Sequence, residues 1–375
     1  MTTESLLKDT EKAILELRSL YRAYGYLPYK MNKFEEYDFY ARNKEFLVSD
    51  GIISFTDTNG KLMALKPDVT LSIIKNYKEE PGCIQRVYYN ENVYRISGDT
   101  HEFKEIMQTG LECMGNLDGF NIMEVLTVAL KSLQTISKEF VLEISHMGFL
   151  AGLLKEADKG EDFNKKIMTC IGEKNPHGVE ALCKEHEVEK AVAEKLMKFI
   201  GIYGERHAVL KDLADLSAGS EEMEAALQEL QQISDLLDQS RFSDKVRFDF
   251  SLVNDMNYYD GLVFQGFVSG VPEVILSGGQ YDRLMQRMGY QSGAMGFALY
   301  LDLLDYIRTT GTQYDVDAVL LYEDGCNYAE LKETLRELAS QNCTVSVQRG
   351  IPSGISYRKL LKFNGKGVEV LEDND

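Results

Sequence analysis

The spacing of apolar residues predicts that the chain begins with an amphipathic helix and continues into strands. Apolar side chains recur at helical spacing across Leu6–Tyr24, and Gly25 stands where such a helix should end. Over about Glu45–Pro67 the pattern changes to short strand-like runs, and the turn DTNG at 57–60 joins ISFTD to KLMAL. A turn of this composition between two apolar runs predicts a β-hairpin.

A second hairpin is predicted soon after the first. A short helix near Val69–Tyr77 precedes two strand candidates, CIQRVYYNENVYR and KEIMQTGLECMG, which the polar loop ISGDTHEF joins. Successive hairpins are typical of an antiparallel sheet. We therefore expect such a sheet to form the centre of the molecule.

Helical and strand patterns alternate in large blocks along the rest of the chain. The stretch from about 147 to 240 is charged and helix-rich, which predicts a helical insertion. Strand patterns return in VRFDFSLV, YYDGLVFQGFV and PEVILSGG, and AMGFALYLDLLDYI is predicted to be a helix containing small residues. The predicted class is α+β, with an antiparallel sheet flanked by helices in a core of residues 1–311. A small α/β domain is predicted at 315–375.

Composition narrows the range of functions. With 375 residues, 44% of them hydrophobic, the chain can bury a large core. The formal net charge of −19, without a block of Lys and Arg, argues against a nucleic-acid partner. The six cysteines form no C-x-x-C pair, so neither a metal site nor a disulfide framework is expected. No apolar run approaches the ~20 residues of a membrane helix, and the charged N-terminus is unlike a signal peptide, so we expect a cytoplasmic protein without membrane contact.

One strand carries side chains suited to ligand binding. In MQTGLECMG, Gln108, Gly110 and Glu112 point to the same face because side chains alternate along a strand. An amide and a carboxylate on either side of a glycine could bind a ligand that has an amino group and a ring N–H. A solvated sheet face with a glycine bulge is the alternative, and this strand alone favours it.

Two further segments are ambiguous when each is taken alone. In LKPDVT, Asp68 and Thr70 could cap the following helix or bind an ammonium group. Adjacent Tyr258 and Tyr259 in VNDMNYYDGLVF are typical of sheet packing with a hydrated hydroxyl. The order of these segments along the chain is more informative than any one of them.

Four segments, in order, resemble the signature segments of the histidyl-tRNA synthetase family, which has the class II aminoacyl-tRNA synthetase fold. They are LKPDVT, NVYRISGDTHEFKEIMQTGLECMG, NYYDGLVF and GGQYDRLMQRMGYQSGAMGFALYLDLL. The resemblance extends to about residue 310. It implies that the 315–375 segment is similar to a truncated form of the family's anticodon-binding domain.

The resemblance also implies a pocket for histidine. It places Asp68 and Gln108 near the α-amino group of the ligand, together with Thr70. Around the imidazole ring it places Glu112, Tyr258, Tyr259 and Tyr281. A carboxylate that faces a ring N–H would reject apolar analogues, because its buried acceptor would then stay unpaired.

The family's catalytic arginines are largely replaced. Arg95 matches the first of them and is a possible phosphate or nucleotide contact. The other three positions fall on Glu102, Asn254 and Leu303. Adenylation needs cations on the phosphates where charge develops, so the resemblance implies a histidine pocket with no catalytic residues and no cofactor.

That combination is similar to the family of regulatory subunits of ATP phosphoribosyltransferase, which acts first in histidine biosynthesis. The segments YYNENVYR and MALKPDVT resemble this branch. It implies a hetero-oligomer with a short-form catalytic subunit that is activated by this chain and inhibited by histidine, and a homodimer through Glu35–Tyr40. The alternatives are a divergent histidyl-tRNA synthetase or a free-standing amino-acid-activating enzyme, with cations from Lys66, Lys104 or Arg283. A binding module for another metabolite also stays open.

Overall fold

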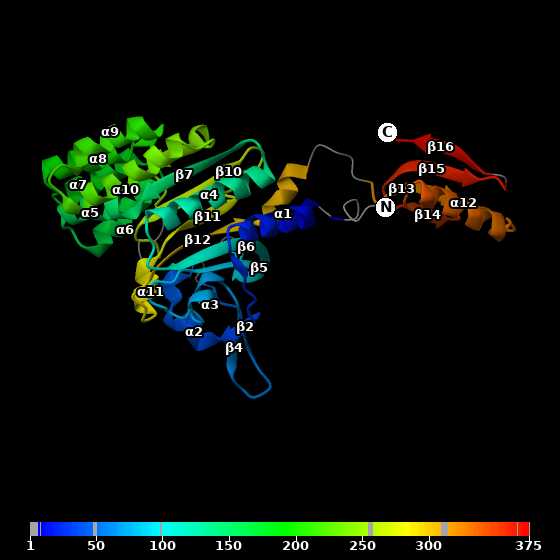
Figure 1. Cartoon of the computed structure of the whole chain (residues 1–375), viewed down its shortest axis with the longest axis horizontal. Coiled ribbons are helices and arrows are strands. Elements are labelled where there is room, and N and C mark those ends of the chain that lie inside the picture. The colour runs from blue at the N-terminus through cyan, green and yellow to red at the C-terminus, as the bar shows by residue number, and fades with distance from the viewer. Residues whose placement is uncertain are drawn as a thin grey trace. The chain divides into compact units, whose positions relative to one another are not determined.

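The chain forms two compact units, Lys8–Ile307 and a second that takes in Arg308–Asp375. The computed structural model describes residues 7, 9–47, 51–97, 100–253, 258–308, 314–365 and 367–374. The segment 309–313, which includes the predicted end of the core at 311, lies outside these ranges. Each unit is therefore described by itself (Figure 1).

A nine-stranded sheet forms the centre of the larger unit. Its strands, in spatial order, are β1 (Leu27–Pro28), β5 (Gln85–Ile96), β6 (Phe103–Gly115), β12 (Gly293–Tyr300), β11 (Leu276–Gln280), β10 (Leu262–Val268), β7 (Phe140–His146), β9 (Val246–Asp249) and β8 (Tyr203–Gly204). Neighbours are antiparallel except for β1 with β5 and β7 with β9. The predicted α+β class is confirmed, and the sheet is mixed at its margins.

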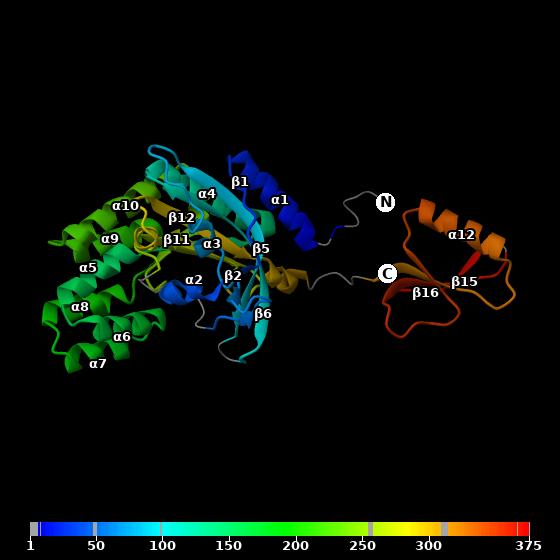
Figure 2. The same ribbon diagram turned by 90° about the horizontal axis from the view of Figure 1, so that it is seen from below.

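Two long helices lie side by side against this sheet (Figures 1 and 2). Helix α1 (Asp9–Ala23) ends before Gly25, whose φ of 80° only glycine adopts readily, as predicted. Helix α4 (Gly119–Ile136) starts at a capping box in which the side chains of Asp118 and Asn121 each accept the other residue's backbone N–H. The apolar faces of both helices close the core on this side.

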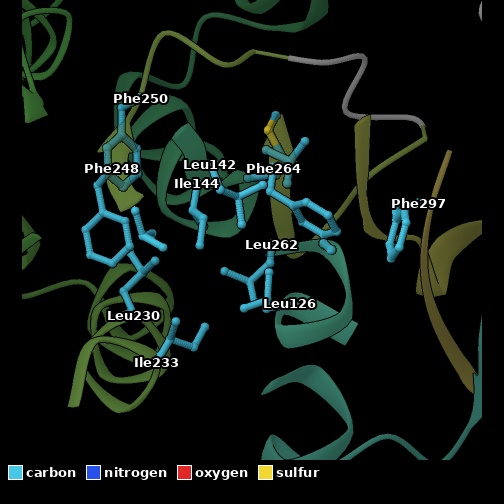
Figure 3. Packing of buried hydrophobic residues seen from close by; sticks show 14 of the residues in the cluster. Leu126, Leu142, Ile144, Leu230, Ile233, Phe248, Phe250, Leu262, Phe264 and Phe297 are labelled. Carbon is cyan, nitrogen blue, oxygen red and sulfur yellow. The ribbon is translucent and has the colours of Figure 1, made fainter. Parts of the chain in front are cut away.

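The same core continues from the sheet into the helical insertion (Figure 3). Leu126 of α4 and Phe264 of β10 belong to one apolar cluster with Ile144 of β7. Phe248 and Phe250, in and just after β9, extend the cluster toward the insertion. The insertion is thus packed onto the edge of the sheet and does not form a separate core.

The insertion lies between β7 and β9 in the chain. Its helices are α5 (Met147–Ala157), α6 (Glu161–Gly172), α7 (Pro176–Glu185), α8 (Lys190–Phe199), α9 (Arg206–Ser217) and α10 (Glu221–Asp238). The buried Arg206 guanidinium ties α9 to α10 by donating to Ser234 O at 2.7 Å and Asp238 Oδ1 at 2.7 Å. A short 3₁₀ turn, Ser243–Lys245, then leads into β9.

A smaller sheet precedes β5 and β6 in sequence. It consists of β2 (Phe34–Glu36), β4 (Leu62–Leu65) and β3 (Ser54–Thr56), and the β3–β4 hairpin is the one predicted from DTNG. Helix α2 (Tyr37–Arg42) and the 3₁₀ turn Lys44–Phe46 follow β2. Helix α3 (Thr70–Ile74) follows β4, near its predicted position.

The predicted helix in AMGFALYLDLLDYI is wrong. Its first seven residues belong to β12, and a 3₁₀ segment, Leu301–Arg308, follows. The small residues Ala294, Gly296 and Ala298 alternate along this strand, which lies between β6 and β11. Both faces of the strand are largely buried, so apolar residues on the second face hide the alternation that would distinguish a strand.

The smaller unit is a four-stranded sheet with one helix. Its order is β14 (Val345–Gln348), β13 (Val316–Leu321), β15 (Tyr357–Phe363) and β16 (Val368–Asp373), with only the β15–β16 pair antiparallel. Helix α12 (Tyr328–Ser340) connects β13 to β14 and packs Leu331 against Leu320 and Leu361. In the described part of the chain no helix is long and apolar enough to cross a membrane.

Candidate functional site

A cavity of about 490 Å³ lies over the centre of the large sheet. Its lining includes all seven predicted histidine-pocket residues, Asp68, Thr70, Gln108, Glu112, Tyr258, Tyr259 and Tyr281, and also Arg95. These residues come from four segments spread across the chain from position 68 to position 281. The fold therefore brings the whole predicted set together around one space.

Small residues in neighbouring strands make the floor of the cavity. Strand register places Gly296 opposite both Glu112 and Gly279, and Ala298 opposite both Gly110 and Ser277. A Cβ added at Gly296 would overlap the Glu112 Oε2 atom and the Leu111 carbonyl oxygen. Glycine at this position therefore leaves the space that the Glu112 carboxylate occupies.

Glu112 is the central acidic group of the cavity. Only 1% of its surface is exposed, and its Oε1 accepts a hydrogen bond from Thr70 Oγ1 at 2.7 Å. Its Oε2 accepts from the Tyr281 hydroxyl. Burial raises the pKa of Glu112 to about 8, although the Tyr281 and Thr70 hydrogen bonds oppose the shift, and the charge of Asp68 adds to it.

Asp68 bonds to the first turn of α3 from the position before its N-cap, Val69, and also lines the cavity. Its Oδ1 accepts from the Leu71 backbone N–H at 2.8 Å, in the first turn of α3. Only 6% of the surface of Asp68 is exposed. Burial raises the pKa of this carboxyl, while the Leu71 hydrogen bond and the nearby charge of Arg95 lower it. Two buried carboxylates on one cavity favour a ligand with positively charged or N–H donor groups.

The tyrosines form an aromatic wall beside these carboxylates. The rings of Tyr258 and Tyr259 meet edge to face at 4.5 Å between centroids, and Tyr258 lies 6.0 Å from Tyr281. Burial raises the pKa of all three phenols, so the hydroxyls stay protonated and serve as hydrogen-bond donors. A planar ring that carries N–H groups fits an aromatic wall of this kind.

Gln108 and Arg95 complete the predicted set. Gln108 is 3% exposed, and its Nε2 has no hydrogen-bond partner within the part of the chain that the structure describes. Arg95 Nε donates to the Pro67 carbonyl oxygen at 3.0 Å, which anchors the guanidinium at the cavity. Of the described lining residues, Arg95 is the one with a cationic side chain.

Two of the three other positions that the resemblance matches to synthetase arginines, Glu102 and Leu303, are not among the described residues that line the cavity. Glu102 is exposed in the loop between β5 and β6, and Leu303 packs against the main core. Asn254 lies outside the described residues. Lys66, a possible substitute cation, is buried and forms an ion pair with Glu91 Oε2 at 2.9 Å. Lys104 and Arg283 are not among the described residues that line the cavity.

Sequence reasoning missed several lining residues. They are Glu45, Gln265, Ser277, Tyr300 and a number of apolar and backbone neighbours. Gln265 and Ser277 lie opposite each other on β10 and β11, and Tyr300 lies opposite Gln108. Only the strand register shows these relations, since no local motif marks the three residues. Among the described residues, no group of three or more His, Cys, Asp and Glu side chains could hold a metal ion.

The raised pKa of Glu112 predicts a pH-dependent stability. The pKa of Glu112 is about 8 in the folded chain and ordinarily 4.5, so the folded chain keeps this proton at pH values where the unfolded chain loses it. The contribution of Glu112 to the free energy of unfolding is therefore fully present below pH 4.5 and is lost as the pH rises to about 8. The loss is at most about 1.4 kcal/mol per pH unit. Urea unfolding at pH 5, 6.5 and 8 should therefore show a steeper fall in wild type than in Glu112→Gln. Equal slopes in the two proteins would contradict a raised pKa of Glu112.

Comparison with known proteins identifies the family to which this chain belongs. A family model described as Histidyl-tRNA synthetase matches residues 4–304, which is most of the chain. The chain therefore belongs to the histidyl-tRNA synthetase family.

Within this family, the similarity points to one kind of member. The ATP phosphoribosyltransferase regulatory subunit of Ruminiclostridium cellulolyticum is 26% identical over 98% of this chain and 89% of its own length. A solved ATP phosphoribosyltransferase regulatory subunit/histidyl-tRNA synthetase from Bacillus halodurans C shares the fold, with a TM-score of 0.74, 23% identity and coverage of 94% and 93% of the two chains. A chain of the ATP phosphoribosyl transferase (HisG:HisZ) complex from Thermotoga maritima also shares it, with a TM-score of 0.61, 20% identity and coverage of 77% of this chain and 96% of that one.

Proposed function

We propose that this chain is a non-catalytic regulatory subunit of ATP phosphoribosyltransferase that binds histidine in the described cavity. It joins a short-form catalytic subunit, activates it and makes it sensitive to histidine. The observation that carries the proposal is the convergence of the seven predicted pocket residues on one cavity, in a chain similar over 98% of its length to a regulatory subunit. Its place of action is the cytoplasm.

The cavity supports histidine as the ligand. Asp68 offers a buried carboxylate to an ammonium group, next to the start of α3. Glu112 offers a second carboxylate, already oriented by Thr70 and Tyr281, to an imidazole N–H. The aromatic wall of Tyr258 and Tyr259 supplies the flat surface that such a ring requires.

The lack of synthetase activity is part of the proposal. An adenylating site stabilises the charge that develops on the phosphates with several cations. Here Leu303 packs against the core, Glu102 carries a negative charge and Lys66 is paired with Glu91. Arg95 alone would leave most of that charge uncompensated.

Histidine acts on the catalytic partner through a population shift. A ligand changes an equilibrium between two states of a complex only by its different affinities for them. The cavity walls come from segments that belong to different parts of the fold, so closing them around histidine can alter the surfaces presented to the partner. The complex of two components, HisG and HisZ, from Thermotoga maritima supports this kind of partner.

A homodimer through the region of Glu35–Tyr40 is also proposed. The small sheet presents exposed apolar side chains there, Phe34, Phe55 and Leu62, and the rings of Phe34 and Phe55 meet at 5.3 Å. Exposed apolar clusters commonly mark interfaces.

The change Phe55→Asp should therefore raise the dimer dissociation constant by about 30-fold or more, because it removes a central apolar contact and adds a charge. Light scattering during gel filtration over a dilution series measures this. Phe103→Asp, at another exposed phenylalanine on β6, is the matched control and should leave the dimer intact. Equal behaviour of the two variants would contradict the proposed interface.

Two assays separate the proposal from its alternatives. Histidine should raise the melting temperature of the chain, and histidine-dependent exchange of pyrophosphate into ATP should be absent. Measurable exchange would favour a divergent histidyl-tRNA synthetase or another amino-acid-activating enzyme. No thermal shift with histidine would favour a binding module for a different metabolite.

A further inference from the structure

Two short helices begin at the same carboxylate in the cavity. Thr70 is the first residue of α3 and donates from Oγ1 to Glu112 Oε1 at 2.7 Å. Tyr281 is the N-cap of α11 (Asp282–Arg287), and its hydroxyl donates to Glu112 Oε2. Each oxygen of one buried carboxylate therefore holds the N-terminal end of one helix.

The far ends of these helices are also joined, by Tyr290. Its hydroxyl lies 3.1 Å from the carbonyl oxygen of Ile74, the last residue of α3, and 3.2 Å from that of Tyr77. The hydroxyl has one hydrogen, which it donates between the two acceptors. The rings of Tyr77 and Tyr290 meet edge to face, with 5.0 Å between their centroids. Because Tyr290 comes shortly after the end of α11 at Arg287, it links the C-terminal ends of both helices.

A second set of hydrogen bonds strengthens this link at the surface. Glu79 Oε1 accepts from the backbone N–H of Gln291 at 3.1 Å and from that of Ser292 at 2.7 Å. The Tyr77 hydroxyl donates to Ser292 Oγ at 3.2 Å. We call Tyr77, Glu79, Tyr290, Gln291 and Ser292 the clasp. Glu79 and Gln291 are exposed, and no residue of the clasp is among the described residues that line the cavity.

Packing joins the two helices between their ends as well. Every residue of α3 is buried. Ile74 of α3 belongs to one apolar cluster with Leu284 and Met285 of α11. Packed interiors are hard to compress, so a displacement at one end of a packed element reaches the other end. We therefore expect α3 and α11 to move as one body as long as the clasp holds.

Histidine binding changes the hydrogen bonding of Glu112. In the proposed complex, the ring N–H becomes a third donor to a carboxylate that already accepts from Thr70 and Tyr281. A carboxylate has about four acceptor sites, so a third donor can bind, but the two present donors must leave a site for it. The same ligand therefore acts on the N-terminal ends of both helices.

We propose that Tyr290 is a positioning residue that transmits histidine binding from Glu112 to the surface of the chain at the clasp. With the clasp intact, α3 and α11 shift together, and the exposed residues of the clasp shift with them. Without the Tyr290 hydroxyl, each helix adjusts alone and the change stays inside the cavity. This inference rests on the proposed function, and it names the part of the fold that connects the histidine site to regulation.

The test measures binding and regulation separately in Tyr290→Phe, which removes only the hydroxyl. Calorimetric titration of the full chain gives the dissociation constant of histidine. Phosphoribosyl-ATP formation by the complex with a short-form catalytic subunit gives the inhibition factor, which is the rate without histidine divided by the rate at saturating histidine. Tyr290→Phe should keep the dissociation constant within about 2- to 3-fold of the wild type. It should lower the inhibition factor by about 2- to 30-fold.

Two further variants make the result decisive. Glu79→Ala, at an exposed position of the clasp, should lower the inhibition factor in the same way. Tyr24→Phe is the matched control, because the Tyr24 hydroxyl accepts from Lys131 Nζ of α4 at 2.6 Å and Tyr24 belongs neither to the clasp nor to the described cavity lining. This control should bind histidine and be inhibited by it like the wild type.

The possible outcomes separate this inference from the proposed function. An unchanged inhibition factor in both clasp variants would overturn the inference alone. If Tyr290→Phe loses histidine affinity, or activation without histidine, to the same extent as inhibition, Tyr290 only supports the fold and the inference is wrong. A wild-type chain that binds no histidine, or whose complex histidine does not inhibit, would overturn the proposed function as well.

Discussion

Replacing Gly296 with alanine is expected to block the cavity and destabilise the chain. The new Cβ would overlap Glu112 Oε2 and the Leu111 carbonyl oxygen, and Glu112 Cδ would lie 2.6 Å away. Neither Gly296 nor Glu112 can shift easily, because β12 is bonded on one side to β6 and on the other to β11. Overpacking of this kind costs about 1–3 kcal/mol of unfolding free energy. The carboxylate must also leave its place, so histidine binding should be lost.

Gly119→Ala is the matched control for this substitution. Gly119 is exposed at the first position of α4, and a Cβ there meets nothing within 4 Å. Alanine favours helix, so this variant should be neutral or slightly stabilising. Urea unfolding and the histidine-induced shift in melting temperature measure both effects. If Gly296→Ala has the stability and the histidine response of the wild type, the cavity floor at Gly296 is not tightly packed against Glu112.

Replacing Glu112 with alanine should abolish specific recognition of the histidine ring. The change removes the acceptor for Thr70 Oγ1 and the Tyr281 hydroxyl, and, in the proposed complex, the acceptor for the ligand N–H. Losing a buried hydrogen-bond acceptor leaves the ligand N–H unpaired, which should reduce histidine affinity by about 10- to 100-fold. Calorimetric titration with histidine gives this number directly. The chain should still fold, because the substitution also removes a buried carboxylate whose pKa is raised.

A glutamate outside the cavity provides the comparison. Glu124 accepts from Arg86 Nε at 2.9 Å and is not among the described lining residues. Glu124→Ala should therefore bind histidine like the wild type. If Glu112→Ala and Glu124→Ala bind histidine equally well, the ligand does not meet Glu112 and the assignment of the pocket fails.

Local patterns predicted many of the elements of the fold. The turn DTNG and the polar loop ISGDTHEF each identified a hairpin, because turn chemistry acts between neighbouring residues. The pattern failed at β12, where tertiary packing buries both faces and the alternation disappears. The parallel pairing of β7 with β9 was not predicted either, because the whole helical insertion separates them in sequence.

The candidate site was predicted in part, for a similar reason. Asp68, Gln108 and Glu112 lie in segments whose order along the chain resembles a known family, and the structure places them on one cavity. Gln265 and Ser277 reach the same cavity through the pairing of β10 with β11, which leaves no mark in either segment alone. The role of Gly296 likewise depends on a neighbour 184 positions away in the chain, so only three-dimensional contacts show it.

The central claim is that the chain regulates a phosphoribosyltransferase in response to histidine. Its most direct test is the rate of phosphoribosyl-ATP formation by a short-form catalytic subunit from the same source, with and without this protein, at several histidine concentrations. We expect the wild type to activate the catalytic subunit and histidine to reverse this activation, whereas in Glu112→Ala histidine should reverse it poorly. A rate that is the same with and without this protein would contradict it.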